Sequence, residues 1–191
     1  MIDKSVPYVE VLMKRKKGTA IPDVKLPAGY NFAYFKKGDE KAWAKIETSV
    51  LEFSNEFEAL IYFQEKFMSF VSELELRCIF IENQAGEKIA TATAWWCYLG
   101  NRRDPILHWV AVKPDYQRLG LGNAIVSKAV KLLIEIEGDI DIYLHTQTWS
   151  HKAIKLYKKI GFEISNEKNL PKYTNESYEK ALDILKNIYH T

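Results

Sequence analysis

Residues 110–124 read Val-Ala-Val-Lys-Pro-Asp-Tyr-Gln-Arg-Leu-Gly-Leu-Gly-Asn-Ala. The stretch begins as a buried strand and then turns into a helix through two closely spaced glycines, Gly120 and Gly122. Backbone N–H groups at a helix start carry partial positive charge and lack intrahelical partners, so a diphosphate can satisfy several of them at once. Glycine lets the backbone approach such a ligand, because no Cβ stands in the way. The stretch predicts a phosphate site, although the same glycines also suit a plain tight turn.

The hydrophobic period changes repeatedly along the rest of the chain, which predicts a mixed α/β fold. Runs with helical spacing alternate with β-rich runs, and the turn-like segment Asn83–Gly86 separates two strands that should pair as an antiparallel hairpin. The predicted strands cover residues 8–13, 30–35, 77–82, 88–96, 106–112, 140–146 and 162–164, and the predicted helices begin at Asp39 and cover 56–74, 120–136, 150–160 and 176–188.

The amino-terminal stretch is interpreted as an addition to this core. Its alternating run at residues 8–13 predicts a strand, and the basic cluster Lys14–Lys17 is typical of a strand end that faces solvent. Residues 18–29 contain prolines and glycines that indicate a loop. We expect a single domain, with a core at about 30–165, a short strand extension at 1–29 and a carboxy-terminal helix at 175–190.

The composition argues against several classes of protein. The 191 residues are 47% hydrophobic and 27% charged with a formal net charge of +2, which is typical of a globular domain and not of a dedicated nucleic-acid binder. Cys78 and Cys97 lie in apolar runs without the spacing of a disulfide or a metal site. No run approaches the roughly 18 apolar residues of a membrane span, and no signal-peptide pattern is present. We expect a cytoplasmic protein without a metal, membrane or nucleic-acid partner.

Two motifs together resemble the GNAT family of N-acetyltransferases. Gln117–Gly122 matches in full the family signature Gln/Arg-x-x-Gly-x-Gly/Ala, and Ala153–Phe162 is similar to the later motif, in which a helix carrying Leu-Tyr ends at Gly-Phe. The two motifs occur in the family's order, with one strand between them. The resemblance implies the GNAT fold, a mixed twisted sheet with flanking helices in which two neighbouring parallel strands splay apart. These strands would be residues 106–112 and 140–146.

The resemblance also implies an activity and a cofactor. Members of the family transfer the acetyl group of acetyl-CoA to a primary amine, by direct attack in a ternary complex. Ser150 stands where the family often has asparagine, and a serine side chain reaches less far. Carried over residue by residue, the implied cofactor contacts are Val110, Ala111, Val112, Gln117, Arg118, Leu119, Gly120, Leu121, Gly122, Asn123, Ser150 and Ala153.

The transfer requires an acid for the departing thiolate and a base for the protonated amine. Tyr157 occupies the family's acid position, and a phenol with a pKa of about 10 can protonate a thiolate whose thiol has a pKa of about 8.5. The strand at 106–112 holds no carboxylate but does hold His108, as in arylalkylamine members of the family. Histidine titrates close to neutral pH, which suits a base.

His108 has an equal alternative interpretation as a hydrogen-bonded core residue. In a regular strand it shares a face with Ile106, Val110 and Val112. A polar side chain on such an apolar face indicates a specific structural or functional role. Deprotonation through water, with a second ionisable group helping, stays open. The groups that could help are Glu47, Glu52 and His145.

Polar and aromatic residues at the end of the second splayed strand predict an acceptor site. His145, Gln147 and Trp149 would alternate to one face beside the gap, and Trp96 adds aromatic surface. Ordinary strand-end packing is the equal alternative. We expect a small-molecule or peptide amine as acceptor. A non-catalytic acyl-CoA sensor and an enzyme acting on a protein or on aminoacyl-tRNA are the remaining alternatives, and a homodimer is compatible with the sequence.

Overall fold

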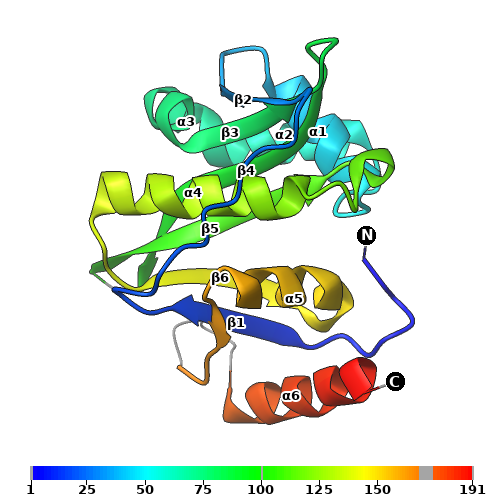
Figure 1. Cartoon of the computed structure of the whole chain (residues 1–191), viewed down its shortest axis with the longest axis vertical. Helices are drawn as coiled ribbons and strands as arrows, with labels where there is room; N and C mark the ends of the chain where they lie inside the picture. Colours follow the sequence, from blue (N-terminus) through cyan, green and yellow to red (C-terminus); the bar gives the residue numbers. More distant parts are fainter. Residues whose placement is uncertain (1, 100, 168–173, 191) are drawn as a thin grey trace.

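A computed structural model describes residues 2–99, 101–167 and 174–190 (Figure 1). Helices flank one seven-stranded sheet within these residues, which confirms the expected mixed α/β architecture. The elements in chain order are β1 (Glu10–Arg15), β2 (Asn31–Tyr34), α1 (Glu40–Ser49), α2 (Glu56–Phe67), η1 (Met68–Phe70), α3 (Val71–Arg77), β3 (Cys78–Glu82), β4 (Lys88–Leu99), β5 (Arg102–Val112), η2 (Pro114–Tyr116), α4 (Leu121–Glu137), β6 (Ile142–Gln147), η3 (Thr148–Ser150), α5 (His151–Lys159), β7 (Glu163–Ile164) and α6 (Asn175–His190).

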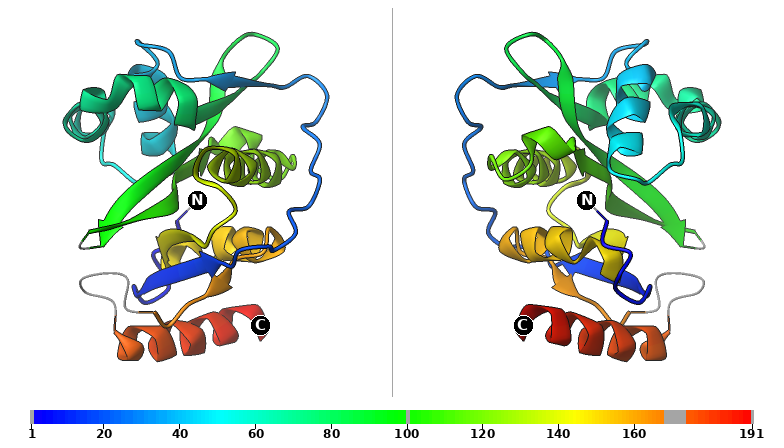
Figure 2. Two further views of the ribbon diagram at one scale, coloured as in Figure 1. Left: turned by 90° about the vertical axis from the view of Figure 1, so that its left-hand side faces the viewer. Right: turned by 90° about the vertical axis from the view of Figure 1, so that its right-hand side faces the viewer.

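The strand order of the sheet is β2-β3-β4-β5-β6-β1-β7. Its neighbours pair antiparallel except β5 and β6, which are parallel and meet at a single register pair, Ile106 with Tyr143. Beyond that pair the two strands separate, and Figure 2 shows the sheet divided there into a half with β2–β5 and a half with β6, β1 and β7. The splayed parallel pair implied by the sequence is therefore present, between the expected strands.

A β-bulge in β5 accompanies the separation. The register with β4 shifts between Thr91 and Thr93, and Trp109 adopts a φ of 48°, which is unusual for a residue with a side chain. The extra residue reverses the alternation of side chains. Ile106 packs in the cluster with α1 and α2, whereas Val110 and Val112 pack in the cluster with α4. The expectation that His108 shares a face with both valines is thus wrong, because a bulge is not visible in a periodic pattern.

The amino-terminal strand lies inside the sheet. β1 pairs antiparallel with β6 over its whole length and with β7 on its other side, and Val11, Leu12 and Met13 are fully buried. This stretch is thus part of the core, although the sequence places it before a core that begins near residue 30. The basic cluster is not simply solvated either. The side chain of Arg15 is buried against Asp139, and Lys14 pairs with Asp141 and Glu167.

Helices cover both faces of the sheet (Figures 1 and 2). α4 and α5 lie on one face, and α1, α2 and α3 lie on the other. α2 begins at Asn55, whose side-chain oxygen accepts a hydrogen bond from the backbone N–H of Glu58 at 2.9 Å. The single helix expected at 56–74 is interrupted by the 3₁₀ turn η1. No helix in the described ranges combines the length and apolar character needed to cross a bilayer.

Candidate active site

The turn from β5 into α4 is built as the sequence predicts. The Gln117 side-chain amide donates to the carbonyl of Val112 at 2.9 Å, which ties the turn to the end of the strand. Gly120 caps α4 with a φ of 83°, in the left-handed region, and no side chain caps the helix. The first N–H groups of α4 are therefore left for solvent or for a ligand.

A cavity of about 330 Å³ opens beside this turn. Gly122 lines it in the first turn of α4, where a Cβ would come within 2.8 Å of the Leu156 side chain on α5. The cavity contains most of the expected cofactor contacts, namely Val110, Ala111, Val112, Gln117, Arg118, Gly120, Gly122, Asn123, Ser150 and Ala153. Two expected contacts do not line it, because Leu121 is buried in the core and Leu119 has an exposed side chain.

Other lining residues are not among the cofactor contacts that the resemblance implied. Ile2, Val50, Lys152 and Leu156 line this cavity, as do Tyr157 and Glu52, which the sequence analysis named as possible catalytic groups. Lys152 could have been predicted from the sequence, because it lies two residues after the predicted helix start and its positive charge suits the predicted phosphate site. Nothing in the sequence indicates that Ile2 lines the cavity, because long-range contacts bring the amino-terminal segment there. The Asp3 backbone N–H donates to the carbonyl of Trp149, and the Trp149 indole N–H donates to the carbonyl of Val6.

A second cavity, of about 220 Å³, adjoins the first between β5 and β6. Its walls include His108 and Trp109 from β5, and His145 and Gln147 from β6. Glu47 enters from α1. The two cavities share Glu52, Val110, Ser150, Ala153 and Tyr157, so these residues lie at their junction.

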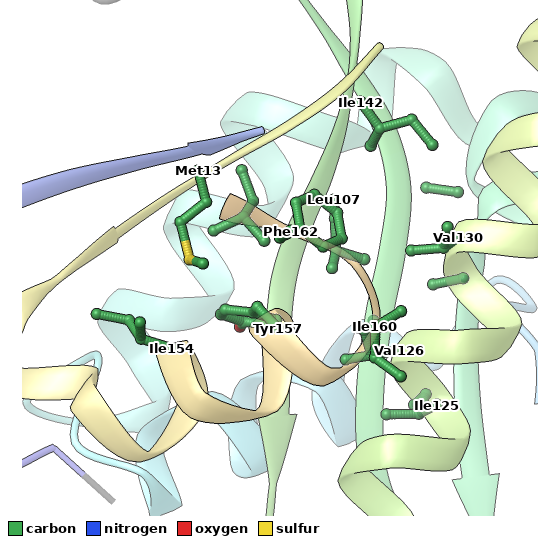
Figure 3. Packing of buried hydrophobic residues seen from close by; sticks show 14 of the residues in the cluster. Met13, Leu107, Ile125, Val126, Val130, Ile142, Ile154, Tyr157, Ile160 and Phe162 are labelled. Carbon is green, nitrogen blue, oxygen red and sulfur yellow. The ribbon is translucent and has the colours of Figure 1, made fainter. Parts of the chain in front are cut away.

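Tyr157 lies at this junction, on α5. Figure 3 shows it beside Ile154 and Phe162 in the cluster between α4, α5 and the sheet, and only 7% of its surface is exposed. Burial raises the pKa of the phenol, and the charges of Glu47 and Glu52 raise it further. The hydroxyl group therefore keeps its proton at neutral pH, and the residue combines core packing with access to both cavities.

Both histidines of the second cavity are uncharged at neutral pH. Burial lowers the pKa of His108 to about 3, helped by the nearby His145, and burial lowers the pKa of His145 to about 4. The Nδ1 atom of His108 is buried and has no hydrogen-bond partner among the described residues. The hydrogen bond expected of a core histidine is therefore missing at this nitrogen.

Two carboxyl groups face the same space. Glu47 lies on the buried side of α1 and is 1% exposed, and burial raises its pKa, with a further contribution from the charge of Glu52. Glu52 follows α1, and burial raises its pKa too, opposed by a hydrogen bond with Gln147 and by the charge of Lys4. The signal for Glu47 is its position on the apolar face of α1, four residues after the buried Trp43.

Two aromatic residues expected at the acceptor site lie elsewhere. Trp149 packs edge-on against Tyr8 of the amino-terminal segment, with ring centroids 5.0 Å apart. Trp96 stacks on Trp95 and lies against the guanidinium group of Arg103, 4.5 Å from its ring centroid. Neither tryptophan lines the two cavities, which corrects the expectation for both. His145 and Gln147 do line the second one.

Comparisons with known proteins agree with this geometry. Residues 41–162 match the model of the Acetyltransferase (GNAT) family. The chain is 37% identical over 54 residues to an N-alpha-acetyltransferase of Sulfurisphaera tokodaii, an alignment that covers 28% of this chain and 32% of the relative. It is 32% identical over 84 residues to the probable N-acetyltransferase san of Drosophila melanogaster, covering 44% of this chain and 41% of the relative.

The fold recurs in a GCN5-related N-acetyltransferase from Sphaerobacter thermophilus. The TM-score is 0.65 at 15% identity, and the match covers 84% of this chain and 49% of that one. The matched region is thus about half of that solved chain, and less than half of each of the two relatives. The family match extends over more than half of the sequence and includes both motifs and both splayed strands. The chain therefore belongs to the GNAT acetyltransferase family, whose members generally use acetyl-CoA.

Proposed function

We propose that this protein is an N-acetyltransferase that moves the acetyl group of acetyl-CoA to a primary amine by direct attack in a ternary complex. The observation that carries the proposal is the junction of the two cavities. One adjoins the helix start at Gly120, and the other lies between the splayed strands, and both are lined by Glu52 and Tyr157. A donor and an acceptor bound in these cavities would meet beside a carboxyl group and a phenol.

The first cavity fits the anionic end of the cofactor. The uncapped N–H groups at the start of α4 offer hydrogen bonds to a diphosphate, and Arg118 and Lys152 add positive charge. When bound, acetyl-CoA supplies an acetyl group activated as a thioester. The small residues Gly122 and Ala153 leave the space beside the end of β5 open.

For the base we propose Glu52, one of the groups that the sequence left open beside His108. A base works best when its pKa lies near the working pH. The pKa of His108 is about 3, so its imidazole accepts protons poorly, whereas burial moves the pKa of Glu52 upward from 4.5. The Glu52 carboxylate takes the proton of the ammonium group, and His108 is left to form a hydrogen bond with the acceptor through Nδ1.

Tyr157 is the proposed acid. The amine nitrogen forms a bond to the acetyl carbon as the carbon–sulfur bond breaks, and the phenol gives its proton to the departing sulfur. The proton that the nitrogen then loses returns to the phenolate, which leaves a neutral amide, a free thiol and a neutral tyrosine. The raised pKa of Tyr157 keeps the proton in place until the thiolate forms. Its buried position beside Phe162 holds the ring in one orientation.

Other functions of the same fold predict different behaviour. A sensor would bind coenzyme A without amine-dependent release of thiol, and the two ionisable groups at the junction would then have no use. The names of the two relatives, an N-alpha-acetyltransferase and a probable N-acetyltransferase, favour an amine acceptor. An aminoacyl-tRNA acceptor is disfavoured by the formal net charge of only +2, because binding to nucleic acid depends on neutralising phosphates.

The test is release of free thiol from acetyl-CoA with a panel of primary amines, in the wild type and in Tyr157→Phe. The variant should bind coenzyme A within a few-fold of the wild type, and its turnover should fall by about 100-fold to 10,000-fold, the usual contribution of general acid catalysis. Tyr98→Phe is the matched control, because Tyr98 is 66% exposed and lies outside both cavities. Thiol release that no amine stimulates would reject the proposal.

A further inference from the structure

The second cavity has an unusual set of charges. Two carboxyl groups, Glu47 and Glu52, line it together with the uncharged imidazoles of His108 and His145, and the described residues that line it include no lysine or arginine. Two positively charged side chains, Arg118 and Lys152, line the first cavity, beside the start of α4, which we call the cofactor cavity. Neither of them lines the second cavity.

Glu47 is the less expected of the two acids. It lies on the buried face of α1 between Trp43 and Val50, and it is 1% exposed. Among the described residues, its Oε1 atom is buried without a hydrogen-bond partner, as are His108 Nδ1 and Trp109 Nε1 in the same cavity wall. Buried polar atoms without partners are rare in folded proteins, because each one has lost its bonds to water. Three of them in one wall make this cavity a candidate site for a ligand with hydrogen-bonding groups.

The two cavities are also opposite in electrical character. The cofactor cavity offers a helix start and two cations, which attract phosphate. The second cavity offers two carboxyl groups, whose ionised form is favoured by a nearby ammonium group and opposed by a second anion. Lys4 is a cation outside these walls whose charge lowers the pKa of Glu52, and it does not line the cavity. The electrostatic field in the second cavity therefore favours a positively charged acceptor.

We propose that the second cavity selects a primary amine that enters as an ammonium ion and carries no carboxylate or phosphate beside the reacting nitrogen, with Glu47 as the residue that sets this specificity. Glu47 accepts a hydrogen bond from the acceptor, and Glu52 takes its proton. The inference rests on the proposed function, since it names the acceptor class of that same site. Amines and peptide amino termini both satisfy it, whereas free α-amino acids do not.

The experiment uses acceptors that differ in one group. Phenethylamine, L-phenylalanine and L-phenylalaninamide share a ring and an amino group, but only the free amino acid adds a carboxylate. We expect kcat/KM for the amine and the amide to exceed that for the acid by at least about 100-fold, since an anion placed against a carboxylate is strongly disfavoured. A short peptide with a free amino-terminal phenylalanine and an amidated end separates peptide acceptors from small ones.

Glu47→Gln tests the residue itself. The variant keeps the size of the side chain, and we expect the preference for the amide over the acid to shrink by about tenfold or more, with unchanged affinity for coenzyme A as evidence of an intact fold. Glu65→Gln is the matched control, because it removes the same charge from an exposed position of α2 outside both cavities. The preference should not change in the control.

Binding without turnover separates this inference from the proposed function. Calorimetry on protein saturated with coenzyme A should detect phenethylamine and phenylalaninamide more strongly than phenylalanine. If they bind in this order but no acetyl group is transferred, the proposed function fails and the specificity stands. If phenylalanine binds and reacts as well as its amide, or if Glu47→Gln leaves the preference intact, the inference is overturned.

Discussion

Replacing Glu52 with glutamine removes a carboxylate from the junction of the two cavities while keeping side-chain length and polarity. Burial raises the pKa of this carboxyl group above 4.5, and the hydrogen bond with Gln147 and the charge of Lys4 limit the increase. The ionised carboxylate is therefore a stronger base than that of an exposed glutamate. Its removal should lower kcat/KM for a good amine by about 100-fold to 10,000-fold, the usual contribution of a general base.

The assay is the dependence of kcat/KM on pH, measured by thiol release with phenethylamine. In the wild type the rate should rise with pH through the raised pKa of Glu52, because only the ionised carboxylate accepts a proton. In Glu52→Gln this acid limb should disappear. Unchanged affinity for coenzyme A would show that the variant still folds around the cofactor cavity.

The variant His108→Gln can disprove the assignment of Glu52 as the base. Burial lowers the pKa of His108 from 6.5 to about 3, so protonation of its imidazole is strongly unfavourable near neutral pH. Removing this imidazole should weaken acceptor binding and leave the acid limb in place. An acid limb that survives in Glu52→Gln and vanishes in His108→Gln would show that the histidine is the base and that the reasoning from burial is wrong.

Three further outcomes are expected. Gly122→Val should reduce affinity for coenzyme A by more than about tenfold and also lower the melting temperature, because a Cβ there lies 2.8 Å from Leu156 Cδ1. Glu47→Gln should raise the melting temperature by about 2–4 °C at pH 8 and by less at pH 4, since the raised pKa of Glu47 means that its stabilising effect is lost as pH rises. Leu12→Ala should cost about 2–5 kcal/mol of unfolding free energy in urea, because this side chain of β1 is fully buried.

Each of these three expected outcomes can be contradicted by measurement. Calorimetry that finds full cofactor affinity in Gly122→Val would remove the helix start from the binding site. A Glu47→Gln variant that is less stable than the wild type at pH 8 would mean that the carboxylate has a partner inside the fold. Leu12→Ala is compared with Leu76→Ala, an exposed site expected to change stability by less than about 0.5 kcal/mol. Equal effects of the two substitutions would mean that β1 is not a core strand.

Local sequence was sufficient to predict the turn from β5 into α4. The turn at residues 112–122 is built from neighbours in the chain, so the glycines and the apolar strand before them carry its geometry within one short stretch. The same holds for α5, where Leu156 and Tyr157 follow each other on one helix. The alternation of strands and helices likewise rests on local periodicity, and it predicted the element order with errors mainly at the ends.

The acceptor side depended on contacts between distant segments. The bulge at Trp109 reverses the faces of β5, and the sequence contains no periodic signal for it. Trp149 turned toward Val6 and Tyr8, so it left the expected acceptor site. Glu47 and Glu52 were named only as alternatives, because nothing in their local pattern shows that α1 ends over the gap between β5 and β6.

The surroundings of the two cavities thus differ in how far the amino-acid sequence alone determines them. The family, the order of elements and the glycine turn before α4 follow from short-range patterns, because hydrogen bonds within a helix start and the steric freedom of glycine act between near neighbours. The place of β1 between β6 and β7, the burial that shifts the pKa values of Glu52 and His108, and the charges around the acceptor follow from folding. They arise from long-range packing, since desolvation depends on every segment that surrounds a group and not on its neighbours in sequence.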